Sequence, residues 1–376
     1  MSVQVSYKKQ TIIFLCLFVI LLISLEMGSR IIEYFEVSDC EFLEKDAMSE
    51  IEDDWKKQIC KDLNSIMYEV NGILHLAPNQ SMKTLTINSH GFRGDDFSET
   101  KDFDTNRIFI VGGSTVFGVS TSDDTTISSF IQKNLDNYYP DKKFEVLNAG
   151  ITSAYSYSEK YLIETELIKF QPDLIVVYSG WNDSQGRYGV EYSVPGIKSA
   201  QFTPDTNFSE DPIKKIIKEI DYRTPYVFLK SINKFENYFQ ETNDSKDQIQ
   251  ELWTERMNQI CDTNSKLGIK SIIITQPMLG TGVKQLSNDE QKMLEHYGTY
   301  LVDTLDILDK IAISLVELED TCDGTYDLRM IFDDTNSAIF FDHIHVNELG
   351  DEIIGEEISN IIIDHLQWVG LISFII

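Results

Sequence analysis

The chain has few basic residues for its size, and this shortage excludes a whole class of partner. Against 32 Lys and Arg stand 61 Asp and Glu, which gives a formal net charge of −29 over 376 residues. A negative field of this size repels phosphate backbones, so we predict no binding to nucleic acid. The acidic residues are scattered rather than arranged in long blocks, which indicates a solvated surface and not an acidic interaction tail.

Cysteine is also scarce, and its spacing argues against a zinc site. The five cysteines include no Cys-x-x-Cys pair. Cys16 lies in an apolar run, which leaves an even number that two disulfides would accommodate in an oxidising compartment. Three connectivities remain open for these four, and so do free thiols. The four are Cys40, Cys60, Cys261 and Cys322.

One long apolar run stands near the N-terminus. It extends from Thr11 to Leu25 behind the basic pair Lys8 and Lys9, and with its flanks it reaches the roughly 20 residues that a bilayer-spanning helix needs. A cleaved signal peptide is the alternative, but no small-x-small cleavage site follows the run. We predict a transmembrane signal anchor over residues 11–30, a cytoplasmic tail over residues 1–10, and an extracytoplasmic remainder.

Beyond the anchor, the composition changes once. Residues 31–105 are interpreted as a stalk or cap that is helical and acidic as far as Leu76. Residues 106–368 alternate amphipathic segments with short apolar runs, which are typical of strands buried on both faces of a parallel sheet. Residues 188–248 are expected to be an insertion, and residues 369–376 an apolar tail too short to span a bilayer. The expected strands are Arg107–Val111, Phe144–Asn148, Asp173–Tyr178 and Ser271–Gln276.

Apolar residues at helical spacing lie between the expected strands. Ile163, Leu167 and Phe170 follow an i, i+4, i+7 pattern. A longer face predicts a second helix, and Gly268 directly after it predicts a left-handed C-cap. That face consists of Ile249, Trp253, Met257, Ile260 and Leu267, and a last helix is marked by Ile354, Ile358, Ile361 and His365. The alternation predicts a three-layer α/β/α sandwich with a mostly parallel, flavodoxin-like sheet.

Small and polar residues follow these strands, at the edge where open parallel sheets bind ligands. They supply a hydroxyl nucleophile, backbone donors, an amide side chain and an acid-base pair. The first three segments are Gly112-Gly113-Ser114-Thr115, Asn148-Ala149-Gly150 and Gly180-Trp181-Asn182-Asp183, and the fourth, Phe341-Asp342-His343-Ile344-His345, precedes the last helix.

Each segment taken alone also has a purely structural interpretation. Gly-Gly-Ser is common in turns, Gly150 fits a turn glycine, and Asn182-Asp183 fits a helix cap or an Asx turn. The first segment is no P-loop, because the required lysine is missing. It is no nucleophile elbow either, because Val116 stands in place of the second glycine.

In chain order, however, the four segments resemble the blocks that define SGNH (GDSL-like) hydrolases: a serine block, a glycine block, a Gly-x-Asn-Asp block and a late Asp-x-x-His. The resemblance covers about residues 106–366. It departs at Gly113, where the family name has an aspartate that is not a triad member. Upstream, Asn88-Ser-His-Gly-Phe-Arg93 resembles a segment that often precedes the Gly-Gly-Ser-Thr variant in membrane-anchored members near surface-polysaccharide functions, and the sequence assigns it no chemical role.

The resemblance implies a serine mechanism. Ser114 would be the nucleophile, His345 the base that takes its proton, and Asp342 the group that orients the imidazole. His343 is the neighbouring alternative, but the i, i+3 spacing of Asp342 and His345 favours His345.

The resemblance also implies an oxyanion hole and a class of substrate. The donors would be the backbone N–H groups of Ser114 and Gly150 and the side-chain amide of Asn182, and no metal or organic cofactor is needed. The expected reaction is cleavage of acyl esters, above all acetyl esters, on a small molecule or glycan outside the cytoplasm. Two alternatives stay open: an O-acyltransferase that uses the same site on cell-surface glycans, and an inactive scaffold that binds glycan or partner proteins.

Overall fold

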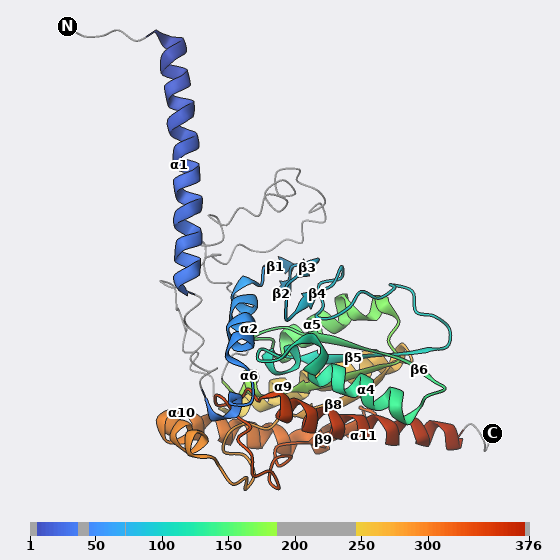
Figure 1. The fold of residues 1–376 in the computed structure, drawn as a ribbon. Coiled ribbons are helices and arrows are strands. Elements are labelled where there is room, and N and C mark those ends of the chain that lie inside the picture. The colour runs from blue at the N-terminus through green and yellow to red at the C-terminus, as the bar shows by residue number, and fades with distance from the viewer. Residues whose placement is uncertain (1–5, 37–44, 72, 186–245, 373–376) are drawn as a thin grey trace. The chain divides into compact units, whose positions relative to one another are not determined.

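The computed structural model describes residues 6–36, 45–71, 73–185 and 246–372 (Figure 1). The chain divides into two compact units, with the N-terminal helix in one and residues 41–190 and 242–376 in the other. The predicted insertion at 188–248 therefore lies almost entirely outside the described residues, as do Cys40 and the last four residues of the predicted apolar tail.

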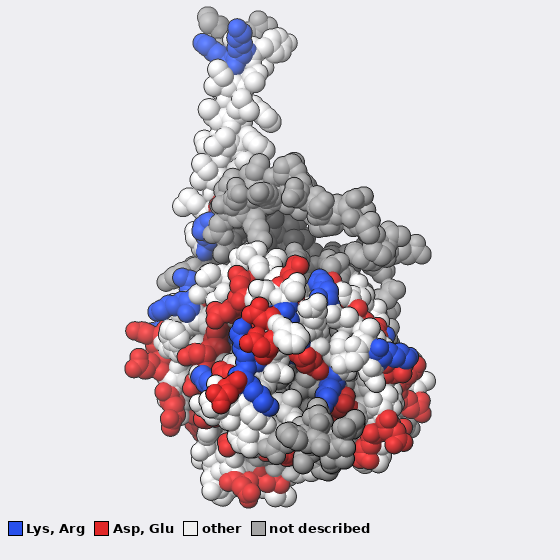
Figure 2. All heavy atoms as spheres, turned by 90° about the vertical axis from the view of Figure 1, so that its right-hand side faces the viewer, with Lys and Arg blue, Asp and Glu red and all other residues white. Residues whose placement is uncertain are grey.

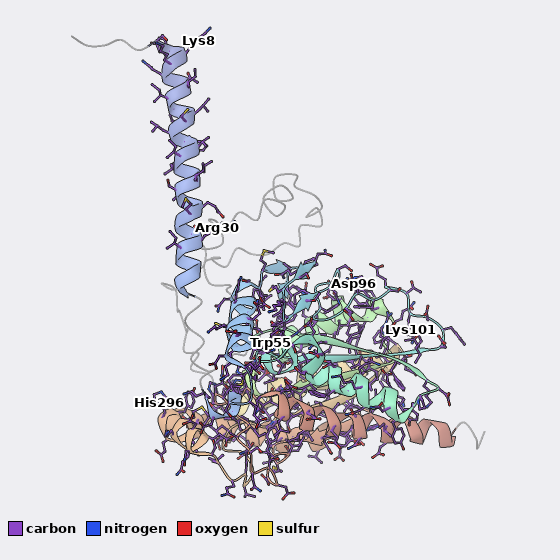
Figure 3. All side chains as sticks on the ribbon, viewed as in Figure 1. Lys8, Arg30, Trp55, Asp96, Lys101 and His296 are labelled. Atoms are coloured by element: carbon purple, nitrogen blue, oxygen red, sulfur yellow. A yellow bond between two sulfur atoms is a disulfide. The ribbon has the colours of Figure 1, made fainter. Side chains whose placement is uncertain are left out.

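Helix α1 (Tyr7–Glu36) contains the apolar run. Its stretch Tyr7–Ile31 has a mean hydropathy of 2.5, its apolar residues are exposed from Ile12 to Leu22, and it is long and apolar enough to cross a membrane. Lys8 lies at its first turn and Arg30 near the opposite end of the apolar stretch (Figure 3). Charged residues thus bracket the stretch, as the sequence predicted for a membrane-crossing helix.

The central sheet of the described chain has five parallel strands in the order β6-β5-β7-β8-β9. Each expected strand is present, within one or two residues of its predicted bounds, and the α/β class with a parallel sheet is confirmed. The edge strand β9 was not predicted, because its sequence Gly-Thr-Tyr-Asp is half-buried and has no apolar run. The bounds are β5 (Thr105–Gly112), β6 (Lys143–Gly150), β7 (Leu174–Ser179), β8 (Lys270–Thr275) and β9 (Gly324–Asp327).

Helices cover both faces of the sheet because its strands are apolar on both sides. Along β5, Phe109 and Val111 face one apolar cluster, while Ile108 and Ile110 face the other. The first cluster is completed by α5 (Ser156–Thr165), the 3-10 helices Leu167–Phe170 and Ser314–Leu318, and α9 (Lys246–Lys266). The second is completed by α4 (Ile127–Tyr138) and α11 (Glu348–Ile372), and α10 (Asn288–Ile313) contributes to both. These three layers are those that the sequence predicted.

Two helical expectations need correction in detail. The face of Ile163, Leu167 and Phe170 belongs to two short helices, since α5 ends at Thr165, although all three residues are buried as expected. Gly268 does adopt the left-handed conformation, with φ of +75°. Leu267, beyond the end of α9 in the cap, is 55% exposed and does not continue the buried face.

The region before the sheet departs most from its prediction. It is helical at Asp46–Met48 and in α2 (Asp53–Ser65), but the antiparallel hairpin β1 (Tyr68–Asn71) and β2 (Ile73–Leu76) replaces the predicted helix as far as Leu76. In the sequence Asn71, the last residue of β1, is followed by Gly72, and an Asn-Gly pair is a strong hairpin signal that outweighs irregular helical spacing. A second small ladder pairs β3 (Gln80–Ser81) with β4 (Thr86–Ile87).

The described residues of this region from 45 onward belong to the same compact unit as the sheet. Four buried residues of this region form one apolar cluster with Phe117, three residues after the predicted nucleophile. They are Ile66, Leu76, Leu85 and Ile87.

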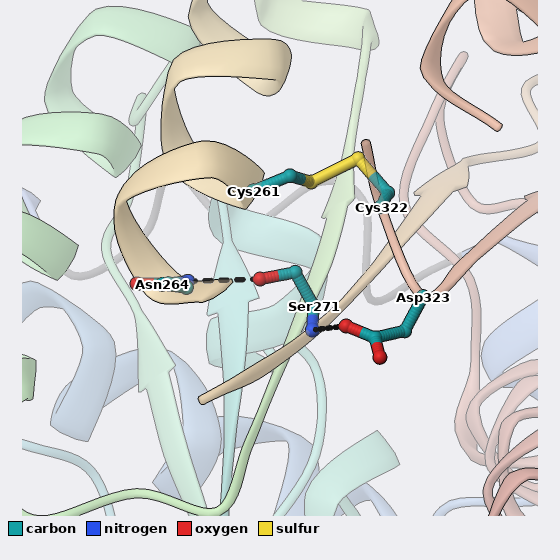
Figure 4. Close-up of a disulfide and its surroundings, with 5 residues drawn as sticks. All are labelled: Cys261, Asn264, Ser271, Cys322 and Asp323. Atoms are coloured by element: carbon teal, nitrogen blue, oxygen red, sulfur yellow. Dashed lines mark hydrogen bonds between the residues drawn. A yellow bond between two sulfur atoms is a disulfide. The ribbon is translucent and has the colours of Figure 1, made fainter. Parts of the chain in front are cut away.

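A disulfide, Cys261–Cys322, joins α9 to the turn before β9 (Figure 4). Cys60 is disulfide-bonded as well, and Cys16 is a free, exposed thiol in α1.

The acidic composition is distributed over the surface. On the face shown in Figure 2, Asp and Glu intermingle with Lys and Arg, and the charges form no continuous basic patch there. This pattern fits the solvated surface that the scattered acidic residues indicate.

Candidate active site

The predicted nucleophile lies where the first strand of the sheet turns into a helix. Strand β5 ends at Gly112, Gly113 follows, and Ser114 opens the short helix α3 (Ser114–Phe117). The Ser114 side chain is half-buried, whereas the next three residues are buried. A strand followed directly by a helix presents the hydroxyl at the carboxyl edge of the sheet, and the first N–H groups of that helix have no acceptor within it.

The acid and the base come from one tight loop. Phe340 and Val346 pair as an antiparallel bridge, and the Phe341 N–H donates to the carbonyl of His345 at 3.2 Å. Inside the loop, Asp342 Oδ1 accepts the N–H groups of Ile344 (2.8 Å) and His345 (2.7 Å). The carboxylate is therefore fixed by the backbone of its own loop.

Three side chains from distant parts of the sequence meet in one hydrogen-bonded chain. His345 Nδ1 lies 2.6 Å from Asp342 Oδ2, and His345 Nε2 lies 2.6 Å from Ser114 Oγ. An ionised carboxylate only accepts, so Nδ1 carries the proton and Nε2 accepts from the serine hydroxyl. The Phe341 ring stacks on the imidazole at a centroid distance of 5.7 Å. This is the geometry that activates a serine.

The charge of Asp342 is secured by its partners. Burial alone would raise the pKa of this carboxyl, but the charge of His345 and the hydrogen bonds from His345 and Ile344 outweigh burial and lower the pKa to about 2. The carboxylate is therefore ionised at every pH at which an esterase would be assayed. His343, the alternative base, packs its ring against Trp181 and Tyr297, and its burial lowers its pKa.

The three oxyanion donors predicted from the resemblance differ in their hydrogen-bond partners. Asn182 lies in α6 (Trp181–Ser184), and its Nδ2 donates to the carbonyl of Ala154 at 2.6 Å. A Cβ built on Gly113 would lie 2.5 Å from the same Nδ2, so the amide rests against the backbone beside Ser114. The Asn182 amide carries a second N–H, and the Ser114 N–H, at the first position of α3, has no acceptor within that helix.

The Gly150 N–H, the third predicted donor, has an acceptor within its own strand. It donates to Asn148 Oδ1 at 3.0 Å, so the structure directs this group to a side chain and not to the space beside Ser114. The glycine serves close packing instead, because a Cβ at Gly150 would lie 2.2 Å from the backbone N of Phe117. Only a residue without a side chain lets β6 approach α3 this closely.

The departure at residue 113 has a steric explanation. The space that an aspartate side chain would enter is taken by the Asn182 amide and, at 3.4 Å from the hypothetical Cβ, by the carbonyl of Ala154. Glycine at this position therefore permits the Asn182–Ala154 hydrogen bond. The Ala154 carbonyl was missed from the sequence, because a backbone acceptor leaves no signal in residue type.

A second serine lies behind the oxyanion segment, in a fully buried network. Ser156 Oγ donates to Asp183 Oδ1 at 2.5 Å, and its N–H donates to Asp183 Oδ2 at 2.9 Å. Arg256 Nη1 donates to Ser156 Oγ at 2.9 Å, and Glu159 accepts from Ser179 Oγ at 2.7 Å. This network connects the start of α5 to α6, the helix that contains Asn182.

The chain is similar to solved structures of esterases and of a G-D-S-L family protein. A catalytic mutant of Axe2, an acetylxylan esterase from Geobacillus stearothermophilus, is 14% identical over 67% of this chain and 91% of its own, with a TM-score of 0.37. The acetyl xylan esterase AlAXEase is 14% identical over 68% and 98%, with a TM-score of 0.40. A lipolytic protein of the G-D-S-L family from Desulfitobacterium hafniense is 10% identical over 68% and 98%, with a TM-score of 0.38. No family model and no curated protein matches the sequence.

Likenesses this distant transfer no activity, so any assignment depends on the site itself. The four sequence blocks that resemble those of SGNH hydrolases meet at the carboxyl edge of one parallel sheet, with Ser114, His345 and Asp342 joined in a single hydrogen-bonded chain.

Proposed function

We propose that the chain is a serine esterase that cleaves acyl esters through an acyl-enzyme on Ser114. The observation behind the proposal is the pair of 2.6 Å contacts that joins Ser114 Oγ to His345 Nε2 and His345 Nδ1 to Asp342. A half-buried serine whose hydroxyl donates to an imidazole, itself oriented by a carboxylate, is the arrangement that makes a hydroxyl nucleophilic at neutral pH.

In the proposed reaction, Ser114 Oγ attacks the ester carbonyl while its proton passes to His345 Nε2. The negative charge of the tetrahedral intermediate is stabilised by the Ser114 N–H and the Asn182 amide. His345 then gives the proton to the leaving alcohol as the ester C–O bond breaks. Water repeats the sequence on the acyl-serine, with His345 as its base, and releases the carboxylic acid and the free enzyme.

We further propose that the substrate is an acetylated carbohydrate outside the cytoplasm. The substrate class rests on the resemblance of Asn88–Arg93 and the Gly-Gly-Ser-Thr segment to membrane-anchored proteins near surface polysaccharides. The location is supported by Lys8 and Lys9 before the apolar helix and by the disulfide Cys261–Cys322, which persists only in an oxidising compartment.

The first test is labelling of the full-length protein in detergent micelles with a fluorophosphonate probe at neutral pH. We expect the wild type to be labelled, and the Ser114→Ala and His345→Ala variants not to be. Ser156→Ala is the matched control, because it removes a serine hydroxyl that is fully buried and donates to the carboxyl of Asp183 rather than to an imidazole. A folded wild type that takes no label would contradict the esterase and favour a binding scaffold.

A second measurement separates hydrolysis from acyl transfer, because both proceed through the same acyl-enzyme and differ in how well water is excluded from it. An esterase should release the alcohol from a chromogenic acetate ester in buffer alone. If turnover becomes appreciable only after an oligosaccharide acceptor is added, and the acetyl group appears on that acceptor, the protein is a transferase.

A further inference from the structure

The segment Asn88–Arg93, to which the sequence assigned no chemistry, is a compact loop that presents one arginine. Asn88 organises it: the Asn88 side-chain oxygen accepts the N–H groups of His90 (3.0 Å) and Phe92 (3.1 Å), and the Asn88 amide donates to the carbonyl of Asp95 at 3.0 Å. Phe92 is buried in the core against Phe109 of β5. The backbone of Arg93 then bridges Ile87 on one side and Asn148 on the other.

The Arg93 side chain is buried, with Nε donating to Asp123 Oδ1 at 2.8 Å and both Nη groups donating to the turn that follows the nucleophile helix. Its Nη1 donates to the carbonyls of Phe117, at 2.8 Å, and of Gly118. Its Nη2 donates to the carbonyl of Thr121 at 2.5 Å. The guanidinium carbon also lies 5.0 Å from the centre of the Phe117 ring. One cation therefore satisfies two carbonyls at the end of α3, where helical partners are lacking, and a third carbonyl further along the turn.

The same turn contacts the segment that carries the base. Ser120 Oγ donates to the carbonyl of Val346, the residue after His345, at 2.9 Å. Thr121 Oγ1 donates to Asp351 Oδ2 on α11 at 3.4 Å. Arg93 therefore holds a turn that is attached at one end to Ser114 and at the other to the loop of His345.

We propose that Arg93 is a positioning residue that sets the distance between Ser114 Oγ and His345 Nε2. The inference rests on the proposed serine mechanism and adds to it a group that touches neither substrate nor reacting atoms. The planar guanidinium donates hydrogen bonds to three carbonyls and one carboxylate at fixed angles, and a lysine ammonium does not reproduce this geometry. Since a displacement of about 1 Å at reacting groups costs roughly 10²-fold in rate, loss of this geometry is expected to lower kcat rather than raise KM.

The chain contains a matched control for the effect of burial. Arg107, at the opposite end of β5, is also buried and also donates to three carbonyls, those of Ser98, Glu99 and Phe170. Each arginine also donates to one carboxylate at 2.8 Å, Arg93 to Asp123 and Arg107 to Glu145. Each guanidinium carbon lies 5.0 Å from the centre of a phenylalanine ring, which is Phe117 for Arg93 and Phe97 for Arg107. The two arginines differ in position relative to Ser114 and not in kind of contact.

The experiment compares Arg93→Lys with Arg107→Lys in the full-length protein in detergent. Both variants are expected to lose similar thermal stability. Only Arg93→Lys is expected to react with the fluorophosphonate about 10²-fold more slowly and to lose kcat on a chromogenic acetate ester at nearly unchanged KM. Equal rate losses in the two variants, or an unchanged rate in Arg93→Lys, would overturn the proposal.

A second readout does not depend on activity. Imidazole NMR of histidine-labelled protein reports the His345 nitrogen that bonds Ser114, and Ser114→Ala identifies that signal. We expect Arg93→Lys to shift this signal toward its position in Ser114→Ala and Arg107→Lys to leave it in place. If the wild type takes no label but Arg93→Lys still shifts the His345 signal, the esterase proposal is wrong and the positioning role stands. If the wild type is labelled but Arg93→Lys changes neither the signal nor the rate, the esterase proposal stands and the positioning role is wrong.

Discussion

The domain contains two serine–carboxylate clusters of similar composition and opposite character. Ser114 is half-buried and donates to His345, which is held by Asp342. Ser156 is fully buried and donates to Asp183, with Arg256 as the neighbouring cation.

The difference shows what a serine needs in order to react. In the first cluster the partner of the hydroxyl is an imidazole that can accept its proton and later return it. In the second, the hydroxyl already accepts from an arginine, which never gives up its charge, and donates to a carboxyl that is itself satisfied. The second cluster therefore fixes the backbone, whereas the first is poised for chemistry.

The sharpest contrast between the clusters is expected from changing one carboxylate in each. Asp342→Asn should lower kcat about 10⁴-fold, because the amide no longer holds Nδ1 in its protonated, oriented form. Asp183→Asn should cost mainly thermal stability, with less than about tenfold loss of activity per folded molecule. The measurement is active-site titration combined with ester hydrolysis and thermal unfolding. Comparable activity losses in both variants would remove the distinction between the clusters.

An intermediate effect is expected where the two clusters meet, at Asn182. Asn182→Ala removes one oxyanion donor and should lower kcat by about 10²- to 10³-fold at nearly constant KM. Asn264→Ala is the matched control. That buried amide donates to Ser271 Oγ near the disulfide (Figure 4), and Ser271 lies near the amino end of β8, whereas the site lies at the carboxyl edge of the sheet. A loss of kcat in Asn264→Ala as large as that in Asn182→Ala would show that general destabilisation explains both.

The smallest effect concerns Glu159 in the buried cluster. Burial, with the nearby charge of Asp183, raises its pKa well above the ordinary value. The folded protein then binds this proton more tightly than the unfolded chain, so the group lowers the free energy of unfolding as pH rises above the unfolded pKa.

Glu159→Gln removes that cost. The variant should melt a few °C above the wild type at pH 8, which corresponds to about 1 kcal/mol, and the difference should shrink toward pH 4. Glu164→Gln, at a half-buried carboxylate of the same helix that is paired with Lys160 at 2.8 Å, should show no such pH-dependent gain. Thermal unfolding monitored between pH 4 and pH 8 checks both, and a Glu159→Gln variant that is destabilised at pH 8 would contradict the assigned charge state.

Much of the architecture was predictable from residue patterns. The four expected strands are each present, since an uninterrupted apolar run is stable only when it is buried on both faces. The choice of His345 over His343 was predictable from an i, i+3 spacing, and the structure places His345 against Ser114. The edge strand β9 was missed because its residues are only partly apolar and its pairing partner decides its conformation. The pairing of β1 with β2 was missed although Asn71-Gly72 is a hairpin signal in the sequence.

Residue types and their order along the chain were sufficient to determine the α/β class, the apolar N-terminal helix, and the three side chains that form the Ser114–His345–Asp342 chain. Only the tertiary structure decided that the Asn182 amide donates to Ala154, that Gly113 makes room for this amide, and that Arg93 holds the turn after Ser114. The physical reason is that the residue type alone fixes the chemistry of a side chain. The partner of a backbone N–H or carbonyl depends on which distant segment packs against it.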